Sequence, residues 1–407
     1  MLKNIKKIIL HFFYLLNFLI VCLIEVPKCL FLIFLNKKKY YFYQSEGGFG
    51  HLISTPMFLN SQFDSDWLLV FSYQKSRYHN KYIKKIFPKN LIFLNNGILT
   101  NFLGIITSHY YCELTMSVIK FFCNIFFKIN LKEYYDLLSK FKKKNYKKET
   151  SYFKGYESKC WREIVDYSKD FDFSENIKEE LKIFFSRFKK GCVGNVLFPI
   201  RTKGSNKSQK DYSNKLRDSR DINDYKKILE DLVSRNYLIF LSGDKIVYPD
   251  WINSQNNIIT FDKTNLDKNY FNLMAGIGSD IVIGGPSGAT MFSMFGKKNL
   301  FLESLDFGVG FNNTIISHPK IKDKDIKNIK ELLTERFIEN KIEFYSEQHI
   351  ELLDKNELFE IYYEFIENIN NKNYGIDPNL LGINEGWLID SRSKISNKWL
   401  DLNNIIY

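Results

Sequence analysis

The sequence has few cysteines, and they are not arranged to bind a metal. Six cysteines occur among 407 residues, with no CxxC pair and no spacing typical of a zinc site. Cys22 and Cys29 lie in an apolar segment, and the others stand where small core residues are expected. The sequence therefore excludes a zinc centre and favours a reducing compartment.

The N-terminal segment lacks the small-residue site at which a signal peptidase cuts. Apolar runs extend over Ile8–Ile24 and Cys29–Leu35, with a polar break at 25–28 and lysines on both flanks. The first run is slightly short for a bilayer span. We expect residues 1–39 to form a membrane-associated segment that lies in or dips into the cytoplasmic leaflet. A single span and a buried pair of N-terminal helices remain as alternatives.

The chain is basic, but it lacks a pattern typical of nucleic-acid binding. Its net charge is +12, which suits nucleic acid, an anionic membrane surface or a phosphorylated substrate. The basic run Lys142–Lys148 contains only one aromatic residue, so it gives little support for nucleic acid. We therefore expect an anionic membrane surface as a partner, and no nucleic acid.

Residues 40–190 have the pattern of a first α/β domain. A strand at Tyr40–Tyr43 runs into the glycine loop Glu46–His51, and an apolar helix begins at Leu52. Two further apolar runs, Trp67–Phe71 and Leu91–Leu94, are spaced as strands of the same sheet. Strand, glycine loop and helix in this order indicate a Rossmann-like domain.

Residues 191–370 predict a second domain of the same class. Its expected strands are followed by polar or glycine-containing loops, which is typical of a parallel α/β sheet. These strands are Val196–Ile200, Tyr237–Leu241, Ile258–Phe261, Ile281–Ile283 and Leu300–Leu302. The tail, 371–407, is expected to pack back onto the first domain.

The stretch between the last two of these strands carries the clearest ligand signal. Gly284 to Pro286 end a β-branched strand, and Ser287 is placed to cap a helix that includes Phe292 and ends at Gly296. Ser287 and Gly288 would then present a hydroxyl and backbone N–H groups at a helix N-terminus, which favours a phosphate. A plain turn and cap without a ligand explains the same residues.

Three motifs in order resemble a group of putative bacterial glycosyltransferases from surface-polysaccharide gene clusters. They are Gly50-His51-Leu52, then Arg217–Tyr225 with the strand that ends at Asp244, and then Ser279–Gly288. The resemblance covers residues 40–407. It implies a GT-B-like fold, in which two Rossmann-like domains face each other across a cleft. It further implies a nucleotide-sugar donor on the C-terminal domain and a glycan or lipid-linked acceptor on the other.

The expected donor-binding residues stand at strand ends of the second domain. They are Arg201, Arg217, Gly243, Asp244, Ser287, Gly288 and Glu303. Arg201 is the first choice for the diphosphate, and Asp218 and Asp221 either hold an arginine or cap a helix. The sequence departs from the family at Thr202, where an aspartate is usual, and has one residue more than usual within Arg217–Tyr225.

Glu46 and His51, in the first glycine loop, are the candidates for the catalytic base that an inverting transfer needs. The resemblance thus implies a hexosyl- or deoxyhexosyltransferase at the cytoplasmic face of the bacterial inner membrane. Two alternatives remain, a catalytically inactive nucleotide-binding protein on this fold and a membrane adaptor.

No cofactor and no essential metal are expected. Asp64-Ser65-Asp66 resembles the metal-binding DxD of one glycosyltransferase class, but there the acidic pair follows a strand, whereas here it precedes one. A polar turn before Trp67 is the simpler interpretation.

We therefore expect transfer activity to survive a chelator. Arginine and backbone N–H groups stabilise a leaving diphosphate without a divalent ion. The measurement is sugar transfer with EDTA, and with added magnesium or manganese. Loss of activity in EDTA that manganese restores would instead make Asp64 and Asp66 metal ligands.

Overall fold

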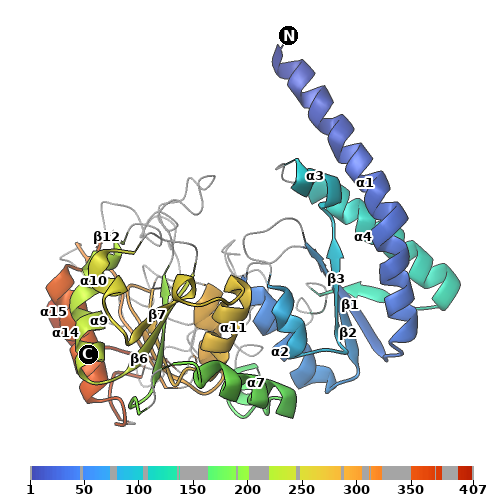
Figure 1. Ribbon diagram of the computed structural model, residues 1–407. Helices are drawn as coiled ribbons and strands as arrows, with labels where there is room; N and C mark the ends of the chain where they lie inside the picture. The colour runs from blue at the N-terminus through green and yellow to red at the C-terminus, as the bar shows by residue number, and fades with distance from the viewer. Residues whose placement is uncertain are drawn as a thin grey trace. The chain divides into compact units, whose positions relative to one another are not determined.

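The computed structural model divides the chain into two compact units, Met1–Lys142 and Lys143–Tyr407 (Figure 1). The residues that the structure describes are 2–45, 49–73, 80–103, 109–134, 137, 164–188, 191–200, 220–243, 248–285, 288–304, 311, 313–322, 350–371, 373–377 and 393–405. Each unit contains a parallel sheet, and each is described by itself.

The first unit has a four-stranded sheet in the order β3-β2-β1-β4, with every neighbouring pair parallel. The strands are β1 (Tyr40–Ser45), β2 (Trp67–Tyr73), β3 (Leu91–Asn95) and β4 (Leu131–Glu133). The connecting helices are α2 (Phe49–Phe63), η1 (Lys81–Lys85), α3 (Ile98–Phe102) and α4 (His109–Phe127). Parallel strands need such crossovers, so helices cover both faces of the sheet.

One face of this sheet is covered by α4 together with the N-terminal helix α1 (Leu2–Leu35), and the other by α2 (Figure 1). The expected break between two apolar runs is wrong, because α1 continues through Pro27. A proline removes one helical hydrogen bond. Val26, Cys29 and Ile33 are nevertheless buried in one core with the strands and α4, and this packing holds the helix together.

The second unit has a seven-stranded sheet in the order β13-β10-β9-β8-β5-β6-β7, again entirely parallel. Its strands are β5 (Asn195–Ile200), β6 (Leu238–Gly243), β7 (Ile258–Thr260), β8 (Ile281–Gly284), β9 (Lys298–Phe301), β10 (Thr314–Ile316) and β13 (Ser393–Ile395). The chain builds outward from β5 in one direction and then returns to continue on its other side. This is the Rossmann order, so the expected α/β class is confirmed.

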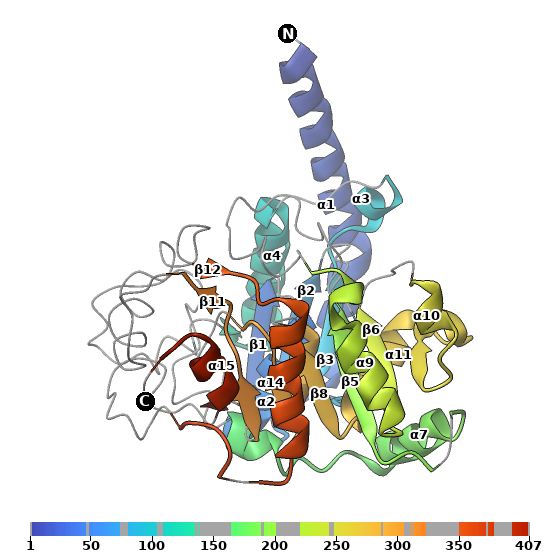
Figure 2. The ribbon, with the colours of Figure 1, turned by 90° about the vertical axis from the view of Figure 1, so that its left-hand side faces the viewer.

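The helices of the second unit lie on the faces of this sheet. They are α7 (Glu175–Phe185), η2 (Ile222–Tyr225), α9 (Lys226–Ser234), α10 (Asp250–Asn253), η3 (Phe261–Lys263), α11 (Lys268–Gly278), η4 (Gly288–Met294), α14 (Lys355–Glu367) and α15 (Asn397–Leu402). A small antiparallel pair, β11 (Lys320–Ile321) and β12 (Ile350–Glu351), joins them. Helices α9 and α14 lie side by side (Figure 2).

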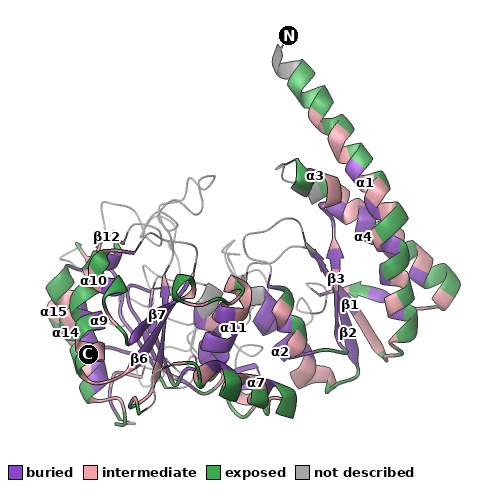
Figure 3. Cartoon of the chain, in the orientation of Figure 1, coloured by how far each residue is buried: buried purple, intermediate pink, exposed green. Residues whose placement is uncertain are grey.

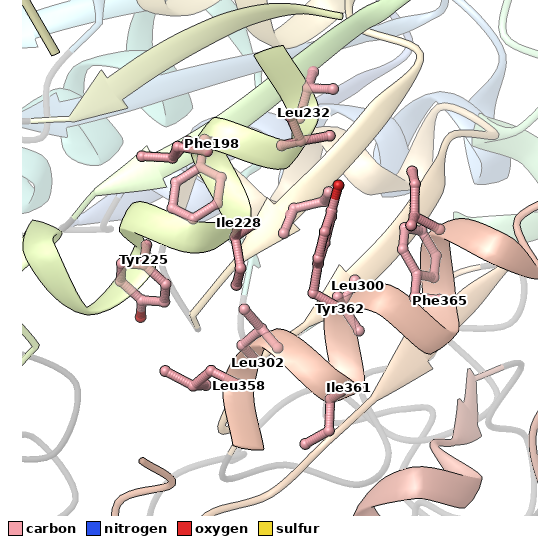
Figure 4. Packing of buried hydrophobic residues seen from close by; sticks show 14 of the residues in the cluster. Phe198, Tyr225, Ile228, Leu232, Leu300, Leu302, Leu358, Ile361, Tyr362 and Phe365 are labelled. Atoms are coloured by element: carbon pink, nitrogen blue, oxygen red, sulfur yellow. The ribbon is translucent and has the colours of Figure 1, made fainter. Parts of the chain in front are cut away.

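The core beneath α9 and α14 is continuous with the sheet (Figure 4). Ile228 and Leu232 of α9 and Leu358, Tyr362 and Phe365 of α14 point into it. These positions repeat at three to four residues on each helix, as one buried stripe requires. The core therefore holds both helices on the same face.

The segment after β8 is a 3-10 helix, η4, rather than the expected α-helix. A 3-10 helix rises about 2.0 Å per residue, against 1.5 Å for an α-helix. The tighter form lets a short segment return along the length of β8, which is roughly 13 Å. Gly296 follows η4 with φ +73°, as expected for a glycine that ends a helix.

Two expected boundaries differ from the structure. Helix α7 was assigned to the first domain, but Phe184 contacts Phe240 of β6 and Phe271 of α11. The tail was expected on the first domain, but β13 pairs with β10, and α15 contacts α14. Both segments thus cover apolar surface that belongs to the second sheet.

We expect Phe184→Ala to lower the free energy of unfolding of the second unit by about 3–5 kcal/mol, the usual cost of removing a buried phenylalanine. Phe184 is 1% exposed, whereas its neighbour Ile183 is 49% exposed. Ile183→Ala is the matched control, with an expected loss of roughly 1 kcal/mol or less. Urea unfolding of the detergent-solubilised chain measures both. Equal losses would show that α7 does not dock as described.

Candidate donor site at the carboxyl edge of the second sheet

The centre of the second sheet is the point where the strand order reverses, between β5 and β8. In open α/β sheets, ligands bind outside the carboxyl ends of the strands at this point. Gly284 ends β8, and a Cβ there would lie 3.1 Å from Pro199 Cδ of β5. The two strands therefore finish close together, and the loops that follow them begin at the same place.

Gly243, at the end of β6, borders the other side of β5. Its φ is +140°, and a Cβ would lie 2.0 Å from the carbonyl oxygen of Ile200. Only glycine fits, because both the backbone angle and the space exclude a side chain. Gly243 and Gly284 thus flank the end of β5, directly before Arg201.

The structure places the described donor-binding candidates at one edge of the second sheet. Gly243 ends β6, Gly288 begins η4, and Glu303 follows β9, so all three lie at the carboxyl edge of one sheet. His51 lies in α2 of the first unit. The predicted residues outside the described part of the chain are Glu46, Arg201, Arg217, Asp244 and Ser287.

Glu303 is engaged by Arg220, a residue that the sequence analysis did not select. Arg220 Nε donates to Glu303 Oε2 at 2.7 Å, and Nη2 donates to Oε1 at 2.6 Å. The side chains are only 12% and 7% exposed. This is a buried, bidentate ion pair of the kind that guanidinium geometry suits.

Backbone groups complete the surroundings of the pair. The Leu353 N–H donates to Glu303 Oε1 at 2.7 Å, and Arg220 Nη2 donates to the Leu353 carbonyl. Asp224 Oδ2 lies 3.6 Å from Arg220 Nη1. Burial lowers the pKa of Arg220, but the bonds to Glu303 and its charge outweigh this effect and raise it. The pair thus ties the loop before η2 to the end of β9.

Tyr225 lies beside this pair and beneath the glycine turn. Burial raises the pKa of its hydroxyl, and the charge of Glu303 raises it further, so the hydroxyl stays protonated. A Cβ on Gly285 would stand 4.0 Å from this hydroxyl. A hydrogen-bond donor therefore lies next to the turn that follows β8.

Glu303 itself has a left-handed backbone, with φ +53°. This conformation costs a non-glycine residue on the order of 1 kcal/mol or more and occurs often at functional sites. The Glu303 N–H donates to Ser317 Oγ at 3.2 Å, which helps to hold it. The carboxylate is therefore fixed in one place by both its backbone and Arg220.

The sequence contains two arginines shortly before Asp221, and Arg217 rather than Arg220 was selected as the donor-binding candidate. Arg220 directly precedes Asp221, which caps η2 by accepting from Asn223 N at 2.9 Å. Asp221 was expected either to cap a helix or to hold an arginine, and it caps. The residue that approaches the arginine is Asp224, one turn later.

The first sheet has its own reversal point, between β1 and β4. Glu46 directly follows β1 in sequence, and Glu133, which was not among the predicted residues, stands at the end of the neighbouring strand β4. Glu133 is opposite Tyr43, whose hydroxyl lies 3.5 Å from Oε2. A three-residue strand is too short to identify from sequence, which is why Glu133 was not selected.

Asp64 and Asp66 lie at the opposite, amino end of β2. The Asp66 carboxylate accepts from Lys39 N at 2.9 Å, and the Asp64 carbonyl accepts from Trp67 Nε1 at 2.8 Å. These contacts belong to the turn before the strand. Among the residues that the structure describes, no group of three or more His, Cys, Asp or Glu side chains could hold a metal ion.

Neither a protein-family model nor a curated protein matches the sequence. Among solved structures, the chain is similar to a glycosyl transferase family 9 protein from Veillonella parvula DSM 2008, with 9% identity, a TM-score of 0.41, and coverage of 80% of this chain and 96% of that one. It is similar to NodZ alpha-1,6-fucosyltransferase soaked with GDP-fucose, with 10% identity, a TM-score of 0.30, and coverage of 64% and 93%.

The wall teichoic acid polymerase TagF is a third similar structure, with 12% identity, a TM-score of 0.26, and coverage of 91% of this chain and 97% of that one. Identities and scores this low say nothing about activity. The fold assignment rests on the strand order of the two sheets.

We expect Arg220→Met to destabilise the second unit by about 3–5 kcal/mol, because it leaves the Glu303 carboxylate buried without its cation. The double variant Arg220→Met/Glu303→Gln should cost less than the sum of the two single changes, because no buried charge is left alone. Urea unfolding gives all four corners of the cycle. Additive losses would mean that the two side chains do not interact.

Lys178 of α7, which pairs with the exposed carboxylates of Asp172 and Glu175, supplies the control for this cycle. Like Arg220→Met, Lys178→Met removes one positive charge, but from a solvent-exposed site. We expect the unfolding transition to stay where it is, since exposed pairs contribute little.

Proposed function

We propose that the protein is a glycosyltransferase that moves a sugar from a nucleotide-sugar donor to a glycan or lipid-linked acceptor in bacterial surface-polysaccharide synthesis. One observation carries the proposal. The reversal point of the second sheet joins the glycine ends of β6 and β8 to the end of β5. A diphosphate needs this close approach of backbone, and two of the three motifs that resemble the glycosyltransferase group include the ends of β6 and β8.

In this proposal Arg201 neutralises the diphosphate, because it directly follows β5 at the reversal point. Ser287 and Gly288 donate to the phosphates, and Gly243 and Asp244 line the base or ribose. Helix η4 is short, so its dipole adds little, and the arginine has to supply most of the positive charge.

Glu303 is one of the expected donor-binding residues, and its carboxylate is suited to accept hydrogen bonds from ribose hydroxyls. Oε1 already accepts from Arg220 and from Leu353 N, whereas Arg220 is the one donor to Oε2 among the residues that the structure describes. A carboxylate oxygen has two lone pairs, so Oε2 retains capacity for one hydroxyl. We therefore assign Glu303 first to positioning the loop and only second to the donor.

The acceptor is proposed to bind at the carboxyl edge of the first sheet. Glu46 and His51 are the candidates for the base that deprotonates its hydroxyl, and Glu133 on the neighbouring strand becomes a third. The exposed apolar surface of α1 supports contact with a membrane, and we propose that this is the cytoplasmic face of the bacterial inner membrane. A lipid-linked acceptor would be available there.

The test of the donor site is Arg201→Ala. Loss of a charge-assisted hydrogen bond should weaken binding of a nucleoside diphosphate by about 1.5–3 kcal/mol. Arg187→Ala is the matched control, because Arg187 is exposed after α7, away from the carboxyl edge. Calorimetric titration with UDP, GDP, CDP and dTDP measures both variants. Unchanged affinity in a folded Arg201→Ala protein would contradict the assignment.

The same sample also separates an enzyme from an inactive nucleotide-binding protein. Sugar release from a panel of nucleotide-sugars, with membrane lipid extract as acceptor source, should accompany the binding. Binding without any turnover over the whole panel would favour the inactive alternative.

A further inference from the structure

Helix α1 has exposed positions from its N-terminal part to its end (Figure 3), and large apolar residues occupy many of them from Ile5 to Leu35. Five large exposed residues are separated by 7, 4, 7 and 11 positions, which places them on one side of the helix. They are Ile5, Phe12, Leu16, Leu23 and Phe34, each between 37% and 77% exposed. This stripe is about 43 Å long at the rise of an α-helix.

Helix α4 extends the same surface. It packs on the same sheet face as α1, so the exposed sides of both helices point away from the sheet. Phe121 and Ile125 of α4 are 59% and 53% exposed. The rings of Phe34 and Phe127 lie 5.4 Å apart, which joins the ends of the two helices. We call the exposed sides of α1 and α4 together the outer face.

The charges within these helices have one predominant sign. Helices α1, α3 and α4 contain the lysines Lys3, Lys6, Lys7, Lys28 and Lys120. Their acidic residues are Glu25, whose side chain is 12% exposed and pairs with Lys28, and the half-buried Glu113. Exposed apolar residues with lysines and no exposed carboxylate are the pattern that binds anionic lipid headgroups.

The contacts of α1 with α3 and α4 argue against a transmembrane orientation of this helix. Tyr14 lies 5.9 Å from Tyr111 of α4, and the buried Asn17 accepts from Leu99 N at 2.9 Å and donates to the Asn96 carbonyl at 2.7 Å. The part of α1 before Tyr14 extends beyond the described parts of α3 and α4 (Figure 1), and from Ile5 it is about 14 Å long. A span needs about 30 Å.

An upright insertion of this short part is also unfavourable. Lys6 and Lys7 are exposed near its tip, and they would lie deep in the hydrocarbon, where charged side chains are costly. A helix that lies along the interface keeps its lysines at the headgroups and its apolar stripe against the acyl chains.

We propose that the outer face of α1 and α4 lies along the interface of an anionic bilayer and that α1 does not cross it. This inference takes from the proposed function only that the protein works at an anionic membrane. The experiment below uses neither donor nor acceptor, so its failure leaves the nucleotide titration unaffected, and failure of the titration leaves this inference unaffected.

The first test is flotation of the full chain with phosphatidylglycerol or phosphatidylcholine vesicles after detergent removal. Phe121→Glu/Ile125→Glu should reduce the bound fraction on phosphatidylglycerol vesicles by roughly tenfold or more, since two apolar groups are lost and two repelled charges added. The control Ile183→Glu makes the same type of change on α7, and its binding should equal that of the unchanged chain. Equal binding by the α4 variant would overturn the inference.

The second test distinguishes a helix α1 that lies along the membrane interface from one that crosses the bilayer. Peptide tags at both ends of the chain are exposed to protease in inside-out membrane vesicles. We expect both tags to be cut at the same rate, because both ends stay on one side. Protection of the N-terminal tag alone would show a span. A third outcome is that the chain does not bind vesicles and forms dimers that the α4 substitutions dissociate. This outcome would overturn the inference and assign the outer face to contact with a second copy of the chain.

Discussion

Parallel strand pairing is the constraint on which the rest of this structure depends. Parallel neighbours cannot be joined by a tight turn, so each connection crosses the sheet and covers one of its faces with a helix. In the first unit the connections supply α2 on one face and α4 on the other. The remaining part of the second face is covered by α1, whose Val26 and Ile33 are buried against the strands.

The same constraint concentrates function at one edge of each sheet. Every strand in a parallel sheet ends on the same side, so loops far apart in sequence converge there. In the second unit this brings Arg220 to Glu303 across 83 positions. The buried pair stabilises the loop only while both partners remain, which makes the arrangement of this edge sensitive to either side chain.

Local patterns were sufficient where one segment determines its own structure. The β-branched run that ends at Gly284 and the helix end at Gly296 follow from residue type and were predicted correctly, whereas the cap at Asp221 was one of two alternatives. The α/β class follows from the alternation of such segments. Sequence patterns were insufficient where contacts between residues far apart in the sequence determine the structure. Pro27 remains helical because of tertiary packing, and β4 was too short to identify from sequence.

The candidate site was likewise predictable only in part. Gly243 and Glu303 follow strands that are visible in the sequence. Arg220 could not be identified from the sequence as the partner of Glu303, because the two residues stand 83 positions apart and only the folded sheet brings them together. The tail was misplaced for a similar reason, since the strand Ser393–Ile395 is recognisable only by its pairing with β10.

The role of α1 in the core has a consequence for how membrane attachment and folding are linked. A chain that began at Tyr40 would lose the lipid-facing stripe, but it would also uncover Tyr43, Leu68 and Ile92, which share a core with α1. Release of such a chain from membranes would therefore not separate lipid binding from unfolding. Substitutions on the exposed sides of α1 and α4 avoid this ambiguity, because they leave the buried side unchanged. The first unit thus combines its sheet cover and its proposed lipid contact in one helix.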